Sequence, residues 1–240
     1  MKILILVFTC EKNTDLVQAA ADTWLKDIDN SHHVKIVGSH NMPGFIGPHQ
    51  VYKPLEQETY YDLSQKVYMS FCKYIDHDWD YLIKCDDDTY VNFPRLLKFL
   101  QYCDQENIDY TGAGNYFIGK RWHLCNYRCN TDQECYAQGG AGYVLSKRAV
   151  SEMLPHLQHT QHTAWEKAED IAVGQAAKLA NINFKCHSNL FDSGFKDWKA
   201  GNAKKQTTSE ALDMMRDEYI TTHHVTTDGM YRIYNMLSDK

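Results

Sequence analysis

The sequence has no block of lysine and arginine, no long hydrophobic run and no Cys-x-x-Cys pair. A formal net charge of -6 without a basic stripe argues against nucleic acid as a partner, because neutralising phosphates requires clustered cationic side chains. No apolar run approaches the ~18 residues that a membrane-spanning helix requires. The apolar run at 3–8 is too short for a signal peptide, and no small-residue cleavage site follows. We therefore expect no membrane span and a reducing compartment, most simply the cytoplasm.

The eight cysteines are scattered, apart from Cys125, Cys129 and Cys135 in one polar stretch. This spacing does not indicate a structural zinc site. An even count permits disulfides but does not require them, so we expect free or loosely paired thiols rather than a metal centre.

The 240 residues are 43% hydrophobic, which is enough for one α/β domain with a sizeable core. Apolar runs and helical spacing alternate in the first half, which predicts a mostly parallel sheet flanked by helices. We expect strands at 3–8, 33–38 and 81–85, helices at 15–26 and 58–76, and a loop at 40–55. Asn92 is expected to cap a further helix with Pro94 in its first turn. After residue 108 the pattern changes to short strands at 109–118 and 142–146, helices from Ser146, after Asp170 and at 209–217, and strands at 182–187 and before His223.

The most distinctive local feature is Asp86-Asp87-Asp88 at the carboxyl end of a predicted buried strand. Ligands of open α/β sheets bind at that edge. In an extended chain Asp86 and Asp88 would point the same way, and two converging carboxylates repel unless a cation joins them. Mg²⁺ or Mn²⁺ held against a diphosphate fits such oxygen ligands. The alternative is an Asp-rich turn that caps a helix.

Two further segments have both structural and chemical interpretations. The run 138–143 has glycine at 139, 140 and 142, which allows close backbone approach to a ligand but is also typical of a tight turn before a strand. Glu169 and Asp170 precede an apolar helical stretch, where acids stabilise a helix N-terminus. One of these two carboxylates could also act as a general base on a hydroxyl group.

The two groups of histidines have different interpretations, one as exposed surface and the other as possible metal ligands. His156, His159 and His162 recur every three residues, but the segment is polar and expected to break near Pro155, so we interpret them as a solvated surface. His223 and His224 follow a predicted late strand. One of their imidazoles could complete a metal site, and an exposed strand end is the alternative.

Six motifs occur in the order found in glycosyltransferase family 31, the β-1,3-glycosyltransferases, and the sequence resembles that family over nearly its whole length. They are Thr9…Asn13…Thr23-Trp24, Tyr60…Leu63…Lys66, 84–91, 139–146, 169–174 and 223–225. Each motif is weak alone, whereas six in the right order form a specific signal. Cys85 stands where alanine or another small residue is usual, and 17–21 lacks the basic residue usual in the first helix.

The resemblance implies a GT-A fold with a Rossmann-like sheet, a UDP-sugar donor, Mn²⁺ (or Mg²⁺) and inversion at the anomeric carbon. It makes residues 1–240 a single catalytic domain with a nucleotide half at 1–108 and an acceptor half at 109–240. Asp88 would be the main metal ligand, with Asp86 and His223, and His224 as the fallback. Asp170, beside Glu169, would deprotonate the acceptor hydroxyl. The donor would contact Thr9, Asn13, Lys66, Asp86, Asp87, Gly139, Gly140, Ala141 and Gly142.

The donor sugar is less defined. Galactose, N-acetylglucosamine, N-acetylgalactosamine and glucose all occur in the family, and one pocket side chain can switch them. The segment 139–146 is very close to that of the core 1 galactosyltransferase, which favours galactose. The acceptor would be a glycan or glycoconjugate, joined by a β-1,3 linkage, and the sequence specifies no oligomeric state.

Two other functions stay open. One is a non-catalytic UDP-sugar-binding, glycan-binding or chaperone-like relative, and the other is a metal-dependent nucleotidyltransferase or hydrolase. The intact acidic and histidine motifs argue against the first, and the glycine segment argues against the second. Animal members of the family are Golgi proteins with a membrane anchor and a stem, whereas this sequence begins at the expected catalytic core. We therefore expect a cytoplasmic location, in a bacterial or viral setting. The alternative is the Golgi lumen, if the chain is a truncated catalytic domain.

Overall fold

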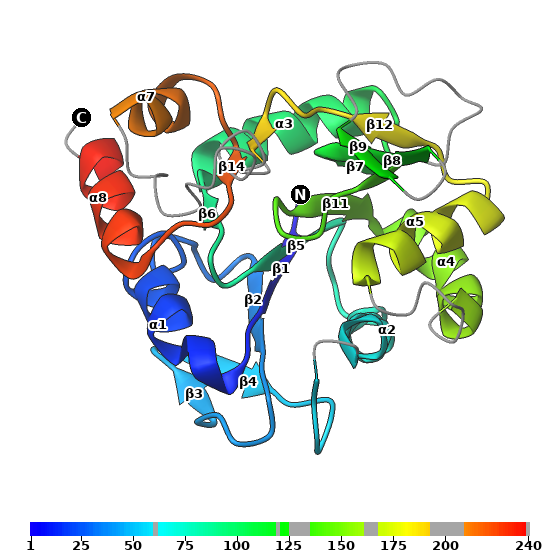
Figure 1. The fold of residues 1–240 in the computed structure, drawn as a ribbon, viewed down its shortest axis with the longest axis horizontal. Coiled ribbons are helices and arrows are strands. Elements are labelled where there is room, and N and C mark those ends of the chain that lie inside the picture. Colours follow the sequence, from blue (N-terminus) through cyan, green and yellow to red (C-terminus); the bar gives the residue numbers. More distant parts are fainter. Residues whose placement is uncertain (60–61, 119–120, 125–134, 161–167, 193–208, 239–240) are drawn as a thin grey trace.

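An eight-stranded sheet forms the centre of the computed structural model, which describes residues 1–59, 62–118, 121–124, 135–160, 168–192 and 209–238 (Figure 1). Its strand order is β12-β7-β11-β5-β1-β2-β4-β3. The strands are β1 (Ile3–Phe8), β2 (His33–Val37), β3 (Phe45–Ile46), β4 (His49–Tyr52), β5 (Tyr81–Asp86), β7 (Tyr110–Gly112), β11 (Tyr143–Ser146) and β12 (Phe184–Cys186).

Most neighbouring strands of the central sheet are parallel. β1 pairs in parallel with β2 and β5, β2 pairs in parallel with β4, and β7 pairs in parallel with β12. β11 runs antiparallel between β5 and β7, and β3 runs antiparallel to β4 at the edge. The predicted mostly parallel sheet is therefore confirmed, with one antiparallel strand inserted beside β5.

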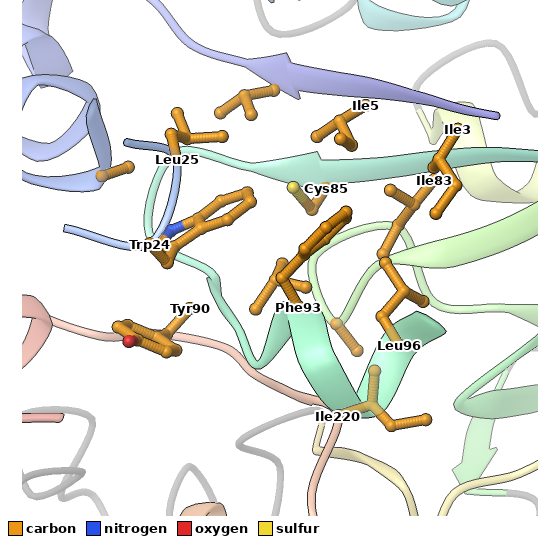
Figure 2. Close-up of a cluster of buried hydrophobic side chains, with 14 of the residues drawn as sticks. Ile3, Ile5, Trp24, Leu25, Ile83, Cys85, Tyr90, Phe93, Leu96 and Ile220 are labelled. Atoms are coloured by element: carbon orange, nitrogen blue, oxygen red, sulfur yellow. The ribbon is translucent and has the colours of Figure 1, made fainter. Parts of the chain in front are cut away.

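Helices cover both faces of the sheet, and the alternation of side chains along β1 shows how. Ile3, Ile5 and Val7 belong to one buried cluster, which Trp24, Phe93 and Leu96 complete (Figure 2). Leu4, Leu6 and Phe8 belong to the cluster on the other face. Because both faces are covered, β1 is apolar at every position. The helices are η1 (Glu11–Asn13), α1 (Thr14–Asp22), α2 (Leu63–Tyr74), α3 (Phe93–Gln105), α4 (Lys147–Thr160), α5 (Glu169–Leu179), α7 (Ser209–Asp217) and α8 (Thr227–Ser238).

Two small three-stranded sheets flank the central one. The first has the order β10-β8-β9 and contains β10 (Cys135–Ala137), β8 (Gly114–Ile118) and β9 (Arg121–Leu124). The second has the order β13-β14-β6 and contains β13 (Phe191–Asp192), β14 (Thr221–Thr222) and β6 (Tyr90–Val91). Pairing of β14 with β6 brings the segment after Thr222 next to the end of β5, although these segments are far apart in the sequence.

Several elements differ from the sequence-based expectation. The predicted loop at 40–55 contains β3 and β4, because Val51 and Ile46 pack into the core despite the surrounding glycines and prolines. α4 continues through Pro155, since Val150, Met153 and Leu157 on one of its faces are all buried. His162 of the histidine stripe lies outside the described residues.

The described part of the chain holds six cysteines as free thiols, Cys10, Cys72, Cys85, Cys103, Cys135 and Cys186. Cys125 and Cys129 lie outside the described residues. None of the helices described above combines the length and the apolar character that crossing a bilayer demands.

Candidate active site

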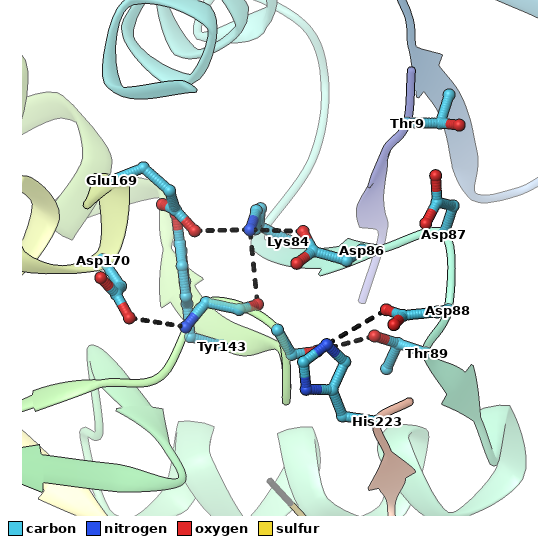
Figure 3. A network of polar contacts seen from close by, with 12 residues as sticks. Thr9, Lys84, Asp86, Asp87, Asp88, Thr89, Tyr143, Glu169, Asp170 and His223 are labelled. Atoms are coloured by element: carbon cyan, nitrogen blue, oxygen red, sulfur yellow. Dashed lines mark hydrogen bonds and ion pairs between the residues drawn. The ribbon is translucent and has the colours of Figure 1, made fainter. Parts of the chain in front are cut away.

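The three aspartates at the end of β5 point to three different partners (Figure 3). β5 ends at Asp86, and the chain turns there, with the amide of Thr89 donating to the carbonyl of Asp86 over 3.2 Å. The carboxylate of Asp86 accepts from Lys84 over 2.8 Å, whereas the carboxylate of Asp88 lies beside His223 and His224. Joint binding of a metal by Asp86 and Asp88 stays a prediction.

Asp88 lies against two histidines that follow β14. Its Oδ1 is 3.1 Å from Nε2 of His223, and its Oδ2 is 3.3 Å from Nδ1 of His224. His224 has a left-handed backbone with a φ of 61°, and its ring stacks on that of His223 with a centroid distance of 3.7 Å. This turn lets two consecutive side chains face one carboxylate, so the residue proposed as a fallback lies in the cluster together with His223.

The cluster of Asp88, His223 and His224 fits a divalent cation. One ligand atom from each residue lies within 4.8 Å of the others. Burial raises the pKa of Asp88, but hydrogen bonds from both imidazoles outweigh it and hold the pKa well below its usual range. A carboxylate that stays ionised beside two imidazoles is a ligand set of the N/O type that first-row divalent ions accept. Asp86 is not among the atoms of this cluster.

Lys84 connects the aspartate segment to the acidic pair of α5. Its side chain is buried at 1% exposure, and its Nζ donates to Oδ1 of Asp86, to Oε1 of Glu169 and to the carbonyl of Gly139. The hydroxyl of Tyr143 donates to the other carboxylate oxygen of Glu169 over 3.1 Å. Burial opposes the charged form of Lys84, but the two carboxylates raise its pKa above the usual value. Both oxygens of Glu169 therefore already have partners.

Asp170 has a different environment from its neighbour. Its Oδ2 accepts from the amide of Gly139 over 3.2 Å, and its Oδ1 accepts from the amide of Ile171 over 2.9 Å. Burial, together with the charge of Glu169, raises the pKa of Asp170 to about 7. The expected capping role holds only in part, because Ala168 is the N-cap of α5 and the two acids form its first turn. A carboxyl group that titrates near neutrality suits a general base.

The glycines allow other side chains to approach closely. A Cβ atom on Gly139 would lie 2.1 Å from Oε1 of Glu169, and one on Gly140 would lie 2.1 Å from Cε1 of His223. Gly142 has a φ of +83°, which other residues rarely adopt. The carbonyls of Gly140 and Ala141 accept from Thr89 and Thr221. These glycines thus bring the cation cluster and the acidic pair together.

A cavity of about 700 Å³ opens at the carboxyl edge of the sheet beside these groups. Burial raises the pKa of Asp87 to about 7, and its carboxylate accepts from Asn13 over 3.2 Å. The ammonium group of Lys66 donates to the carbonyl of Thr9 and to the carboxylate of Glu58. The cavity lining includes the predicted donor-binding residues Thr9, Asn13, Lys66, Asp86 and Asp87, and also Asp88 and His223.

Sequence reasoning did not identify Lys84 or Glu58 as site residues. Lys84 carried a signal, because it is a lone charge inside the apolar run 81–85, where a buried partner was to be expected. Glu58 carried none. The predicted residues 139–142 pack against Lys84, Glu169 and His223 and are not among those that line the cavity in the described part of the chain.

Comparison with known proteins gives a family and a fold. A family model described as Fringe-like matches residues 1–223. The chain is 24% identical to mouse beta-1,3-galactosyltransferase 1 over 99% of its own length and 74% of that protein. It is 30% identical over 112 residues to glycoprotein-N-acetylgalactosamine 3-beta-galactosyltransferase 1 of Xenopus laevis. The first curated relatives are covered over only 9% to 27% of their length.

A solved glycosyltransferase involved in glycosylation of the major capsid of PBCV-1 has the same fold. It superposes with a TM-score of 0.51 at 15% identity over 98% of both chains. The predicted GT-A fold is confirmed by this likeness together with the helix-flanked, mostly parallel sheet.

Gly140→Ala tests the close contact between the glycine segment and His223. The added methyl group would overlap the imidazole ring, so the ring or the glycine segment must shift. We expect the free energy of unfolding to fall by about 1–3 kcal/mol, measured by urea denaturation. Gly44→Ala is the matched control, since a Cβ there meets no atom within 4 Å. Equal stabilities of the two variants would show that His223 does not rest on Gly140.

Proposed function

The chain belongs to the Fringe-like family, and on that premise we propose that it is an inverting glycosyltransferase that uses a UDP-sugar and a divalent cation. The acceptor is a hydroxyl group of a glycan or glycoconjugate, the linkage is β-1,3, and galactose is the preferred sugar. One observation carries the proposal: at the carboxyl edge of β5 a cation-ligand cluster and a half-buried carboxyl group that titrates near neutrality lie on opposite sides of Lys84 (Figure 3).

The cavity supports the donor assignment. Its volume lies within the ~300–1,000 Å³ of small-molecule sites, and it opens where nucleotides bind in open α/β sheets. Asp87 lines this cavity, with Thr9 and Asn13 beside its carboxyl group. The family resemblance implies that Asp87 lies near the ribose of the donor.

Asp88, His223 and His224 would hold the cation. Mn²⁺ is preferred over Mg²⁺, because Mg²⁺ is bound mainly through carboxylates, phosphates and water. When bound, the ion supplies positive charge that stabilises the departing nucleoside diphosphate. The side chain of Asp88 is 24% exposed and belongs to the lining of the cavity.

Asp170 would take the proton from the acceptor hydroxyl. Asp170 lies on the far side of Lys84 from Asp88 (Figure 3). The family resemblance implies that the hydroxyl attacks the anomeric carbon from the face opposite the leaving nucleotide, which inverts the configuration. Glu169 is the less suitable base, because the ammonium group of Lys84 bonds to its carboxylate and stabilises the ionised form, whereas Asp170 accepts only from backbone amides.

Asp88→Ala tests the cation site. We expect this variant to lose Mn²⁺-dependent binding of UDP, because the carboxylate that joins the two imidazoles is removed. Isothermal titration calorimetry with and without Mn²⁺ measures the loss. Asp104→Ala, which removes an exposed carboxylate on α3, is the control and should bind as the unmodified protein does. Full Mn²⁺-dependent binding by Asp88→Ala would contradict the assignment of the cluster.

Asp170→Asn tests the base. A screen of UDP-sugars for release of UDP first identifies the donor. We then expect Asp170→Asn to bind UDP with unchanged affinity and to lose about 10²–10⁴-fold in transfer rate, because the amide cannot accept the proton. Retention of the full rate would show that another group acts as the base.

The transfer rate should also depend on pH through Asp170. The ionised carboxylate is the active form, and its pKa is raised to about 7, so the rate is highest above pH 7 and falls as the pH drops through that value. The rate at saturating donor and Mn²⁺ measures this dependence. UDP binding at each pH is the control, and a rate that stays constant across this range would exclude Asp170 as the titrating base.

A further inference from the structure

Lys84 occupies an unusual position for a charged side chain. It lies in β5, inside the central sheet, where Tyr81, Leu82 and Ile83 precede it and Cys85 follows it. Burying an ammonium group is costly unless its hydrogen bonds and its charge are satisfied. Its three N–H donors meet three acceptors, which belong to three different elements: Asp86 of β5, Gly139 of the glycine segment and Glu169 of α5.

Two of these three elements, the glycine segment and α5, also hold the proposed base. The carbonyl of Gly139 accepts from Lys84, and the amide of Gly139 donates to Asp170. Glu169, which precedes Asp170 in the first turn of α5, is held between Lys84 and Tyr143. The start of α5 is therefore tied to the end of β5 through one ammonium group.

On the basis of the proposed transferase function, we propose that Lys84 is a positioning residue: its ammonium group joins Asp86 to Glu169 and Gly139, and thereby fixes Asp170 relative to the donor cavity. Lys84 acts through its neighbours, since its buried nitrogen has no free donor for a substrate. Displacement of a catalytic group by about 1 Å can lower the rate about 10²-fold.

The effect of Lys84 can also be measured through the pKa of Asp170, which depends on the charged groups around it. Glu169 faces it from α5 and Lys84 from β5, and three tyrosines face it from the strands: Tyr110, Tyr136 and Tyr143. Burial raises the pKa of each tyrosine, so all three are neutral near pH 7. Glu169 raises the pKa of Asp170, and Lys84 lowers it.

The decisive variant is Lys84→Met/Glu169→Gln. Lys84→Met alone leaves two neighbouring carboxylates without a counter-charge and is expected to unfold at a lower temperature. The double variant removes one charge of each sign and is expected to fold, with its thermal midpoint above that of Lys84→Met. Lys73→Met, an exposed lysine near the end of α2, is the matched control.

We expect the double variant to keep Mn²⁺-dependent UDP binding and to lose about 100-fold in kcat, measured well above the pKa of Asp170, where that residue is ionised in every variant. Lys73→Met should retain its kcat. A folded double variant with the kcat of the unmodified protein would overturn the proposal, because the ammonium group would then be needed for stability only.

Nuclear magnetic resonance separates this proposal from the proposed function. The carboxyl carbon of Asp170 is followed in protein labelled with ¹³C-aspartate and assigned by its loss in Asp170→Asn. The pKa of Asp170 should be highest in the unmodified protein, lower in the double variant and lowest in Glu169→Gln, where Lys84 remains without Glu169. Equal pKa values in the last two variants would overturn the role of Lys84. If no UDP-sugar serves as a donor, the proposed function fails, and this titration still decides the role of Lys84.

Discussion

The site depends on the neutralisation of carboxylates that crowd one edge of the central sheet. Five acids meet there, namely Asp86, Asp87, Asp88, Glu169 and Asp170. Like charges in a poorly solvated site repel strongly, so each ionised carboxylate needs a positive or hydrogen-bonding partner. Lys84 forms ion pairs with Asp86 and Glu169, and the imidazoles of His223 and His224 lie within hydrogen-bonding distance of Asp88. Burial raises the pKa values of Asp87 and Asp170, and the neutral donors that bond to these two carboxyl groups offset it only in part.

The fold supplies these partners from distant parts of the chain. β14 pairs with β6 in a register that sets Thr222 opposite Tyr90, and this places the following histidines beside Asp88. The antiparallel insertion of β11 next to β5 sets Tyr143 opposite Lys84. The glycine segment that precedes β11 then passes between the histidine and the acidic pair, and a side chain larger than hydrogen at Gly140 would separate them.

Much of this arrangement could be predicted from the sequence, and the failures have identifiable causes. Strands β1 and β5 were evident because strands buried on both faces are continuously apolar. The joint use of His223 and His224 depends on a left-handed residue, which local sequence does not specify. Glu58 reaches Lys66 from a loop, and no periodicity reveals such contacts.

The acidic pair of α5 shows how two adjacent carboxyl groups acquire different roles. Glu169 and Asp170 share one helix turn, and burial raises the pKa of both. Glu169 faces an ammonium group and a phenol, which stabilise its charge and occupy its lone pairs. Asp170 accepts from two backbone amides, which lower its pKa, but burial and the charge of Glu169 raise it to about 7. When the environments of two neighbouring acids shift their pKa values differently, one acid can act as the base and the other can hold it in place. Lys84 creates this difference, because it binds one acid directly and reaches the other only through Gly139.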